Sequence, residues 1–91
     1  MKTLHLHTDN GHGWLAVKRA RLIELGILGD ISHYSYQRGA TVYLEEDCDM
    51  YKFMVAEDCR TWAELQDKYT VKATHKDRSP VRSYDAFSVR G

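Results

Sequence analysis

The chain has 91 residues, of which 43% are hydrophobic and 29% charged, and its thirteen basic and thirteen acidic side chains give no formal net charge. This length corresponds to one domain and this composition to a packed core, which excludes a disordered or low-complexity protein. The balanced charge disfavours nucleic acid as a partner, because domains that bind phosphates usually carry a basic surplus.

The N-terminus and the cysteines indicate where the protein works. Residues 1–6 lack the apolar run of a signal peptide, and no stretch approaches the roughly 18 apolar residues of a membrane span. If residues 48–59 form one helix, Cys48 and Cys59 lie roughly 16 Å apart. A disulfide requires Cα atoms within about 7 Å. We therefore expect reduced thiols and a soluble protein of the cytoplasm, with no membrane partner.

A hairpin and a short helix are predicted at the start of the chain. Leucine and histidine alternate over residues 3–8, which is typical of a strand, and an Asn-Gly turn separates them from a second strand at residues 14–17. Residues 18–25 have an apolar side and form a helix. Gly26 suits the left-handed position that ends such a helix in a Schellman motif.

A second hairpin is the clearest β signal in the chain. Residues 31–37 and 41–45 are two strands around a tight reversal at residues 38–40. Four carboxylates then crowd residues 45–49, where negative charge favours the start of a helix. That helix is predicted to continue to Arg60.

The rest of the chain is predicted to add a helix, a strand and an extended segment. Thr61 and Glu64 have capping-box spacing, which starts a helix that runs to about Lys68. Residues 69–75 alternate as a last strand. Residues 76–91 are too apolar for a free tail, so we expect them to dock on the body or on a partner.

The order β-β-α-β-β-α-β predicts a single α+β domain over residues 1–91. We expect a mainly antiparallel sheet of about five strands with two or three helices on one face. The opposite face of the sheet, which no helix covers, is the expected place for function.

A metal site is one hypothesis for the histidine-rich start. Its string H-x-H-x-D-x-x-H is similar to the H-x-H-x-D-H of metallo-β-lactamase-like hydrolases, with two residues inserted, and imidazole and carboxylate are zinc ligands. A small-ligand-binding protein, hydrolytic or nucleotide-sequestering, would follow. The favoured interpretation is a polar strand face that holds no metal or cofactor. The residues concerned are His5, His7, Asp9 and His12.

Two further hypotheses concern nucleic acid and cysteine chemistry. Lys18, Arg19 and Arg21 form a basic cluster that could contact phosphate, although such clusters are usually a solvated helix face. Cys48 and Cys59 have no Cys-His signature around them, so we predict no catalytic cysteine and no enzyme.

The tyrosines of the second hairpin and the carboxylates of residues 45–49 are the candidate protein-binding residues. Tyrosine is enriched at interfaces, and clustered carboxylates steer a cationic partner. The alternative roles are ordinary β propensity and helix N-terminal charge. The candidates are Tyr34, Tyr36, Tyr43, Glu45, Glu46, Asp47 and Asp49.

The strings "HGWL", "ISHYSYQRG", "VYLEEDCD" and "SPVRSYDAF" resemble small uncharacterised accessory proteins of phages, prophages and other mobile elements. The likeness covers roughly residues 7 to 87. It implies a protein that binds and inhibits host machinery, including defence systems, as anti-CRISPR proteins do, and it assigns no site residue. The leading hypothesis is therefore a non-enzymatic accessory protein in the host cytoplasm that binds a host or phage protein, and self-association is a further expectation.

Overall fold

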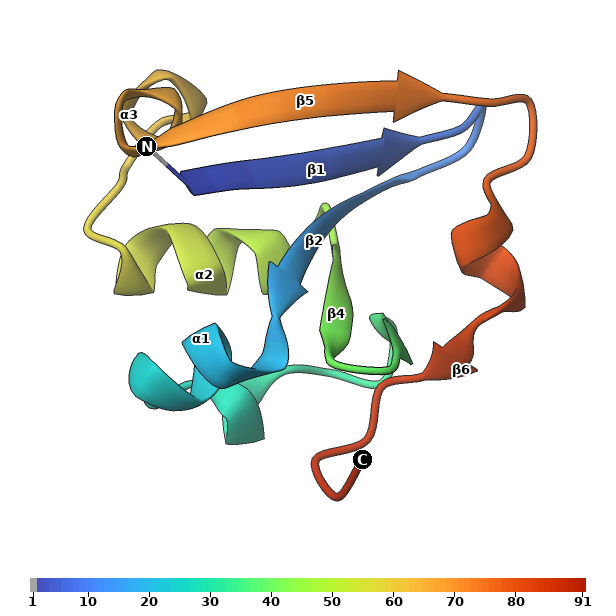
Figure 1. The fold of residues 1–91 in the computed structure, drawn as a ribbon, viewed down its shortest axis with the longest axis horizontal. Coiled ribbons are helices and arrows are strands. Elements are labelled where there is room, and N and C mark those ends of the chain that lie inside the picture. The colour runs from blue at the N-terminus through green and yellow to red at the C-terminus, as the bar shows by residue number, and fades with distance from the viewer. Residues whose placement is uncertain (1) are drawn as a thin grey trace.

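The computed structural model describes residues 2–91, in which one twisted sheet has the strand order β5-β1-β2-β4-β3-β6 (Figure 1). The strands are β1 (Lys2–Thr8), β2 (Gly13–Lys18), β3 (Tyr36–Arg38), β4 (Thr41–Glu45), β5 (Tyr69–His75) and β6 (Asp85–Ala86). The helices are α1 (Arg19–Glu24), α2 (Asp49–Ala56) and α3 (Trp62–Lys68), with 3-10 turns η1 (Leu28–Asp30) and η2 (Pro80–Ser83). All neighbouring strands are antiparallel except β1 and β5. The predicted α+β fold with a mainly antiparallel sheet is confirmed.

The alternation of side chains along β1, β2 and β4 gives the sheet two different faces. Leu4, Leu15 and Leu44 point to the core face and are at most 8% exposed. His5 and His7 point to the other face, which we call the helix-free face. The α2 helix covers the core face with Phe53, and α1 adds Leu22, both fully buried. No helix in the described part of the chain is long and apolar enough to cross a membrane.

The predicted strand over residues 31–37 is wrong for most of its length. Only Tyr36 and Gln37 lie in β3, which continues to Arg38, and the residues before them form a turn. The turn forms because the Ser32 and Ser35 hydroxyls donate to the carboxylate of Asp49, at 2.7 and 2.6 Å. Side-chain bonds of this kind compete with a strand ladder.

The single helix predicted from residue 50 to Arg60 is also wrong, since α2 ends at Ala56. Asp58 takes a left-handed conformation with φ of 60°, and the N–H of Cys59 donates to the carbonyl of Met54 at 2.8 Å. This hydrogen bond and the left-handed residue make a Schellman ending. The Schellman ending that was predicted at Gly26 also occurs, and the φ of Gly26 is 72°. The cysteine spacing argument therefore fails, although both thiols are free.

The capping box and the C-terminal segment complete the fold. The Thr61 hydroxyl accepts from the N–H of Glu64 at 3.1 Å, as its spacing predicts. Residues 76–91 lie against the body, because Val81 and Phe87 are buried and β6 pairs with β3. This segment, red in Figure 1, approaches the sheet at the edge opposite β5.

Candidate functional site

A hollow of about 430 Å³ lies where β2 begins and β4 ends, and we call it the aromatic hollow. Aromatic rings, two carboxylates and one guanidinium surround it. Its lining residues are His12, Trp14, Tyr34, Tyr36, Glu45, Asp47, Cys48 and Arg82.

The register of the sheet brings these side chains together. Trp14 lies directly opposite Glu45 on the neighbouring strand. Trp14 is only 3% exposed, and the ring of Tyr36 meets its ring edge-on at 6.1 Å between centroids. The guanidinium of Arg82 lies 5.2 Å from the centre of the same indole. The tryptophan is therefore the floor of the hollow, with a cation and a second ring packed against it.

Arg82 is held in place by Asp9. Its guanidinium donates to both carboxylate oxygens, at 2.5 and 2.9 Å, and the N–H of Ser79 donates to the same carboxylate. The N–H groups of Gly11 and His12 complete the set of donors. The guanidinium of Arg82, more than any other donor, holds the pKa of Asp9 well below its usual range.

Tyr34 forms the outer rim and is 70% exposed, the highest value among the large hydrophobic residues of the described chain. Its ring stacks on His33, with 4.6 Å between ring centroids. Its N–H donates to the Ser32 hydroxyl, which fixes the turn that carries it. The ring is thus pre-positioned while most of its surface remains in water.

The carboxylates of residues 45–49 have different roles. Glu45 accepts from the N–H groups of Asp47, Cys48 and Asp49 at 2.6–3.0 Å, so it caps the start of α2. Asp49 is fully buried and bound by two serines and Lys52. Its predicted role in protein binding is therefore wrong. Glu46 and Asp47 are exposed and remain available to a partner.

The candidate tyrosines separate into two groups. Tyr34 and Tyr36 line the aromatic hollow. Tyr43 lies farther along the sheet, where its ring contacts Tyr84 and His7, with centroids 5.0 and 5.6 Å away. Burial and the nearby Tyr84 raise the pKa of Tyr43.

The four residues of the metal hypothesis do not meet. His5 and His7 stack 5.1 Å apart on the helix-free face, while Asp9 binds Arg82. His12 lies instead beside Glu46, with 3.8 Å between ring nitrogen and carboxylate. Partial burial, with a smaller effect of His5, lowers the pKa of His7.

Across residues 2–91, one group of three ligand-type side chains is close enough to share an ion, and it consists of Glu45, Cys48 and Asp49. Both of its carboxylates are already occupied as helix cap and buried hydrogen-bond acceptor. The group is therefore explained by the start of α2.

Two of the three residues in the predicted basic cluster serve the fold. Arg21 forms a bidentate pair with the buried carboxylate of Glu57, at 2.9 and 3.1 Å. Arg19 donates to carbonyl groups of the C-terminal segment, including that of Ser88 at 3.0 Å, and lies over the ring of Phe87. Lys18, at the end of β2, is exposed.

Sequence reasoning missed Trp14 and Arg82 as members of a site. The signal for Trp14 was present, because the first hairpin places it opposite His7 and hence on the helix-free face. Nothing local signals Arg82, which lies 73 residues from Asp9. Compared with protein-family models, curated proteins and solved structures, the chain matches none.

Proposed function

We propose that this protein is a non-enzymatic accessory protein, of the kind phages carry, that binds a host protein through the aromatic hollow and inhibits it. A host defence system is the expected class of target. The proposal rests above all on Tyr34. Its ring stacks on His33 and its backbone N–H is hydrogen-bonded, yet the residue is 70% exposed beside a hollow with a tryptophan floor.

The hollow has the composition of a protein-binding surface. Tyrosine, tryptophan and arginine are the residues that most often dominate binding energy, especially where they surround a pocket. Trp14 is buried and Arg82 is bound by the carboxylate of Asp9, so both side chains are already ordered before a partner binds. Rigid groups lose little entropy on binding, which favours affinity.

The charge around the hollow indicates a cationic partner surface. Asp47 lines the hollow and Glu46 lies next to it, and both are exposed. A lysine or arginine of the partner can lie over the ring of Tyr34 while its charge approaches Asp47. Such a contact weakens with added salt, since exposed charges are screened.

Binding is favoured over catalysis because the buried carboxylates and the buried thiol serve the fold. Asp9, Asp49 and Glu57 are buried and held by arginine, serine and lysine side chains. Cys59 is buried, which raises the pKa of its thiol and disfavours the reactive thiolate.

Site-specific photo-crosslinking in bacterial host cells tests the proposal. A benzoyl-phenylalanine in place of Tyr34 is expected to capture a host protein. The same residue in place of Tyr51, which is 60% exposed on α2, is the control and captures none. Asp47→Lys weakens capture, whereas Asp67→Lys on α3 does not.

Three results would count against the proposal. They are absence of a product at position 34, equal products at positions 34 and 51, and a product that contains only a second copy of this chain. The last would make the hollow a self-association surface.

A further inference from the structure

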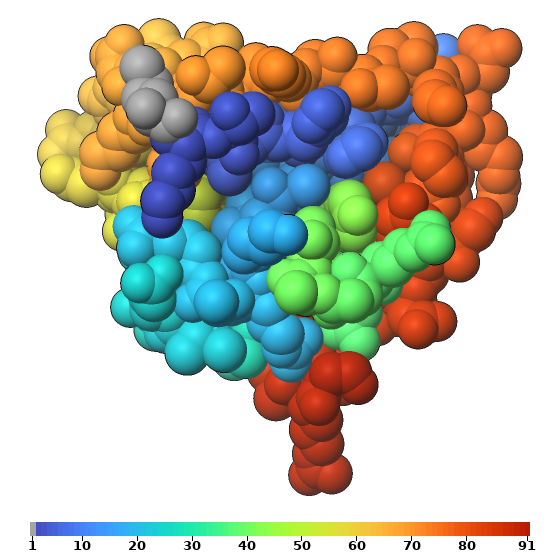
Figure 2. Space-filling model, viewed as in Figure 1, coloured from blue at the N-terminus to red at the C-terminus, as the bar shows by residue number. Residues whose placement is uncertain are grey.

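The helix-free face of the sheet carries a row of side chains unlike those of the aromatic hollow. Strand pairing places Lys72 beside His5, His5 opposite Ala16, and Ala16 opposite Tyr43. Figure 2 looks onto this face, with β1, β2 and β4 in front and α2 largely hidden behind them.

The small side chain of Ala16 leaves a depression beside the rings of His5, His7 and Tyr43. A hollow of about 310 Å³, which we call the sheet hollow, lies there. Its lining residues are Thr3, Leu4, His5, His7, Ala16, Val17, Lys18, Thr41 and Tyr43. The flanking strands β1 and β4 are two strand spacings apart, about 10 Å. The ring of Tyr43 meets that of His7 edge-on at 5.6 Å between centroids, and His7 stacks on His5 at 5.1 Å, so a planar ring in the hollow would lie over Ala16 against this row of rings.

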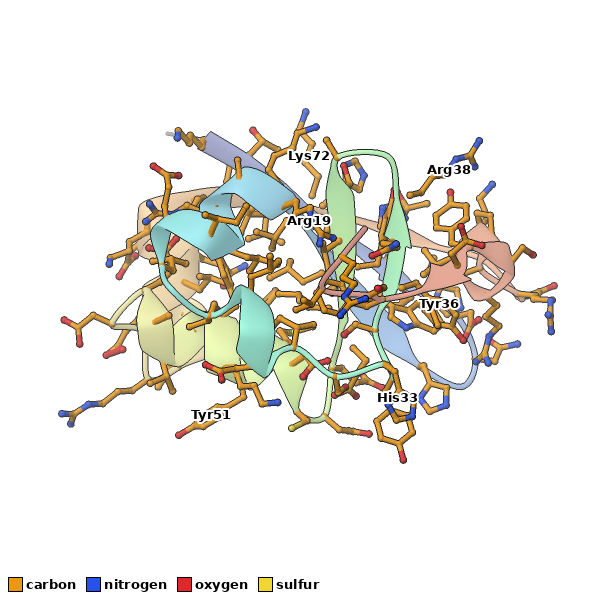
Figure 3. The ribbon with its side chains drawn as sticks, turned by 90° about the horizontal axis from the view of Figure 1, so that it is seen from below. Arg19, His33, Tyr36, Arg38, Tyr51 and Lys72 are labelled. Carbon is orange, nitrogen blue, oxygen red and sulfur yellow. The ribbon has the colours of Figure 1, made fainter. Side chains whose placement is uncertain are left out.

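One cation lines the sheet hollow and two more lie on neighbouring strands. Lys18 lines it, Lys72 lies beside His5, and Arg38 faces Lys18 across the intervening Thr41. Figure 3 shows Arg38 and Lys72 on the same side of the molecule, away from Tyr51 on α2. The Arg38 guanidinium also lies 5.0 Å from the ring centre of Tyr84, so this cation is already placed against a ring.

Carboxylates are scarce on this face. Among the described strand residues whose side chains point to this face, Glu45 is the only one with a carboxylate. It lies at the end of β4, where its oxygens cap α2. Asp85 lies opposite Gln37 in the strand register, and both belong to the core face of the sheet. Asp85 also lines a separate shallow hollow that includes Arg38. The formal neutrality of the whole chain therefore conceals a locally basic surface.

We infer that this face binds single-stranded nucleic acid, with one base in the sheet hollow and phosphates beside Lys18 and Lys72. Sheet faces that combine aromatic rings with basic side chains stack unpaired bases and neutralise the backbone. A duplex cannot use the hollow, because its bases are already stacked. The inference uses Lys18 but not Arg19 or Arg21, and it does not depend on the proposed function.

Fluorescence anisotropy with a labelled oligothymidylate of about ten nucleotides tests the inference. At low salt the probe is expected to bind, and Ala16→Leu, which fills the sheet hollow, weakens binding about tenfold. The double variant Lys18→Glu/Lys72→Glu also weakens binding. It makes the slope of log affinity against log salt shallower by about 1.4, the value for two lost phosphate contacts on a single strand.

A charge-matched double variant is the control. Arg60→Glu/Arg78→Glu changes the net charge by the same amount at exposed positions outside this face, and it leaves affinity within about twofold because distant charges are screened. Circular dichroism verifies that each variant folds, and Ala16→Val replaces Ala16→Leu if the larger side chain prevents folding.

Four results would overturn the inference. They are no binding at low salt, equal loss in both charge variants, tighter binding of a duplex of the same length, and binding of vesicles with anionic lipid in place of the oligonucleotide. The last result would assign the face to a membrane surface.

Discussion

Arg82 and Asp9 connect the C-terminal segment to the first turn of the chain through two hydrogen bonds of 2.5 and 2.9 Å. Asp9 is almost fully buried and also accepts from three backbone N–H groups. The same guanidinium lies on the indole of Trp14. This pair of residues therefore closes the fold and holds Arg82 against the tryptophan floor of the aromatic hollow.

Arg82→Gln is expected to lower the unfolding free energy and to make it depend less on pH in the acidic range. The pKa of Asp9 lies below its unfolded value, so Asp9 contributes stability above about pH 4 that is lost as the pH falls further. Without Arg82 the pKa rises and that contribution shrinks. Urea unfolding of both proteins between neutral pH and acid measures the difference, and Arg78→Gln is the exposed control. Parallel curves for Arg82→Gln and the wild type would contradict this role.

Ser35→Ala is expected to cost about 2 kcal/mol of unfolding free energy. The Ser35 hydroxyl donates to the buried Asp49 at 2.6 Å and accepts from the N–H of Glu45 at 3.0 Å. Its removal leaves a buried carboxylate with one donor fewer. Urea denaturation gives the value, with Ser83→Ala at an exposed position as the control. Equal, small losses in both variants would show that Asp49 is not the anchor of this turn.

Local sequence patterns predicted the strands well where the alternation was regular. The two hairpins were found because their apolar residues repeat every second position around turn-forming residues. The strand over 31–37 was misassigned because the serines that pull it into a turn bind Asp49, which lies beyond the hairpin. The parallel pairing of β1 with β5 joins segments more than sixty residues apart, and no local pattern encodes it.

The candidate site was only partly predictable for the same reason. Tyr34, Tyr36, Glu45 and Asp47 were candidates from the sequence, and they do line one hollow. The sequence could not separate Asp47 from Asp49, since their roles depend on which of them faces the two serines. Arg82 enters the hollow only because the C-terminal segment folds back over the sheet.

Replacement of Asp58 by glycine is expected to stabilise the protein by about 1 kcal/mol. Asp58 ends α2 in the left-handed region, with φ of 60°, where a side chain costs energy. The sequence signal for this ending was weak because aspartate occupies the position that glycine usually takes. Gly26→Ala is the matched reverse variant. Gly26 has φ of 72° and open space around it, so an added methyl group meets no neighbour and the variant isolates the backbone cost. Gly26→Ala should therefore lower the unfolding free energy by about the same amount.

Thermal and urea unfolding of Asp58→Gly and Gly26→Ala measure both changes. If neither variant changes the unfolding free energy, the two helix endings are not held in the left-handed conformation in solution. An unchanged Asp58→Gly beside a destabilised Gly26→Ala would mean that the aspartate side chain compensates for its own strain.

His7 makes the sheet sensitive to mild acid. Burial and the neighbouring His5 hold the pKa of His7 below its ordinary value of about 6.5. The unfolded chain therefore takes up a proton first as the pH falls below that value, so the unfolding free energy decreases until folded His7 is protonated as well. Tyr43 faces His7 edge-on and Lys72 lies beside His5, and neither supplies a negative charge in this pH range.

His7→Gln is thus expected to flatten the decline in stability just below pH 6.5, a window separate from the carboxylate window near pH 4. Urea unfolding at intervals of pH tests this, and NMR titration of the ring protons measures the pKa of His7 directly. His33→Gln is the control, because His33 is exposed on the turn before β3. If the two variants change the curve equally, or if the ring of His7 titrates at or above 6.5, the fold does not disfavour protonation of His7.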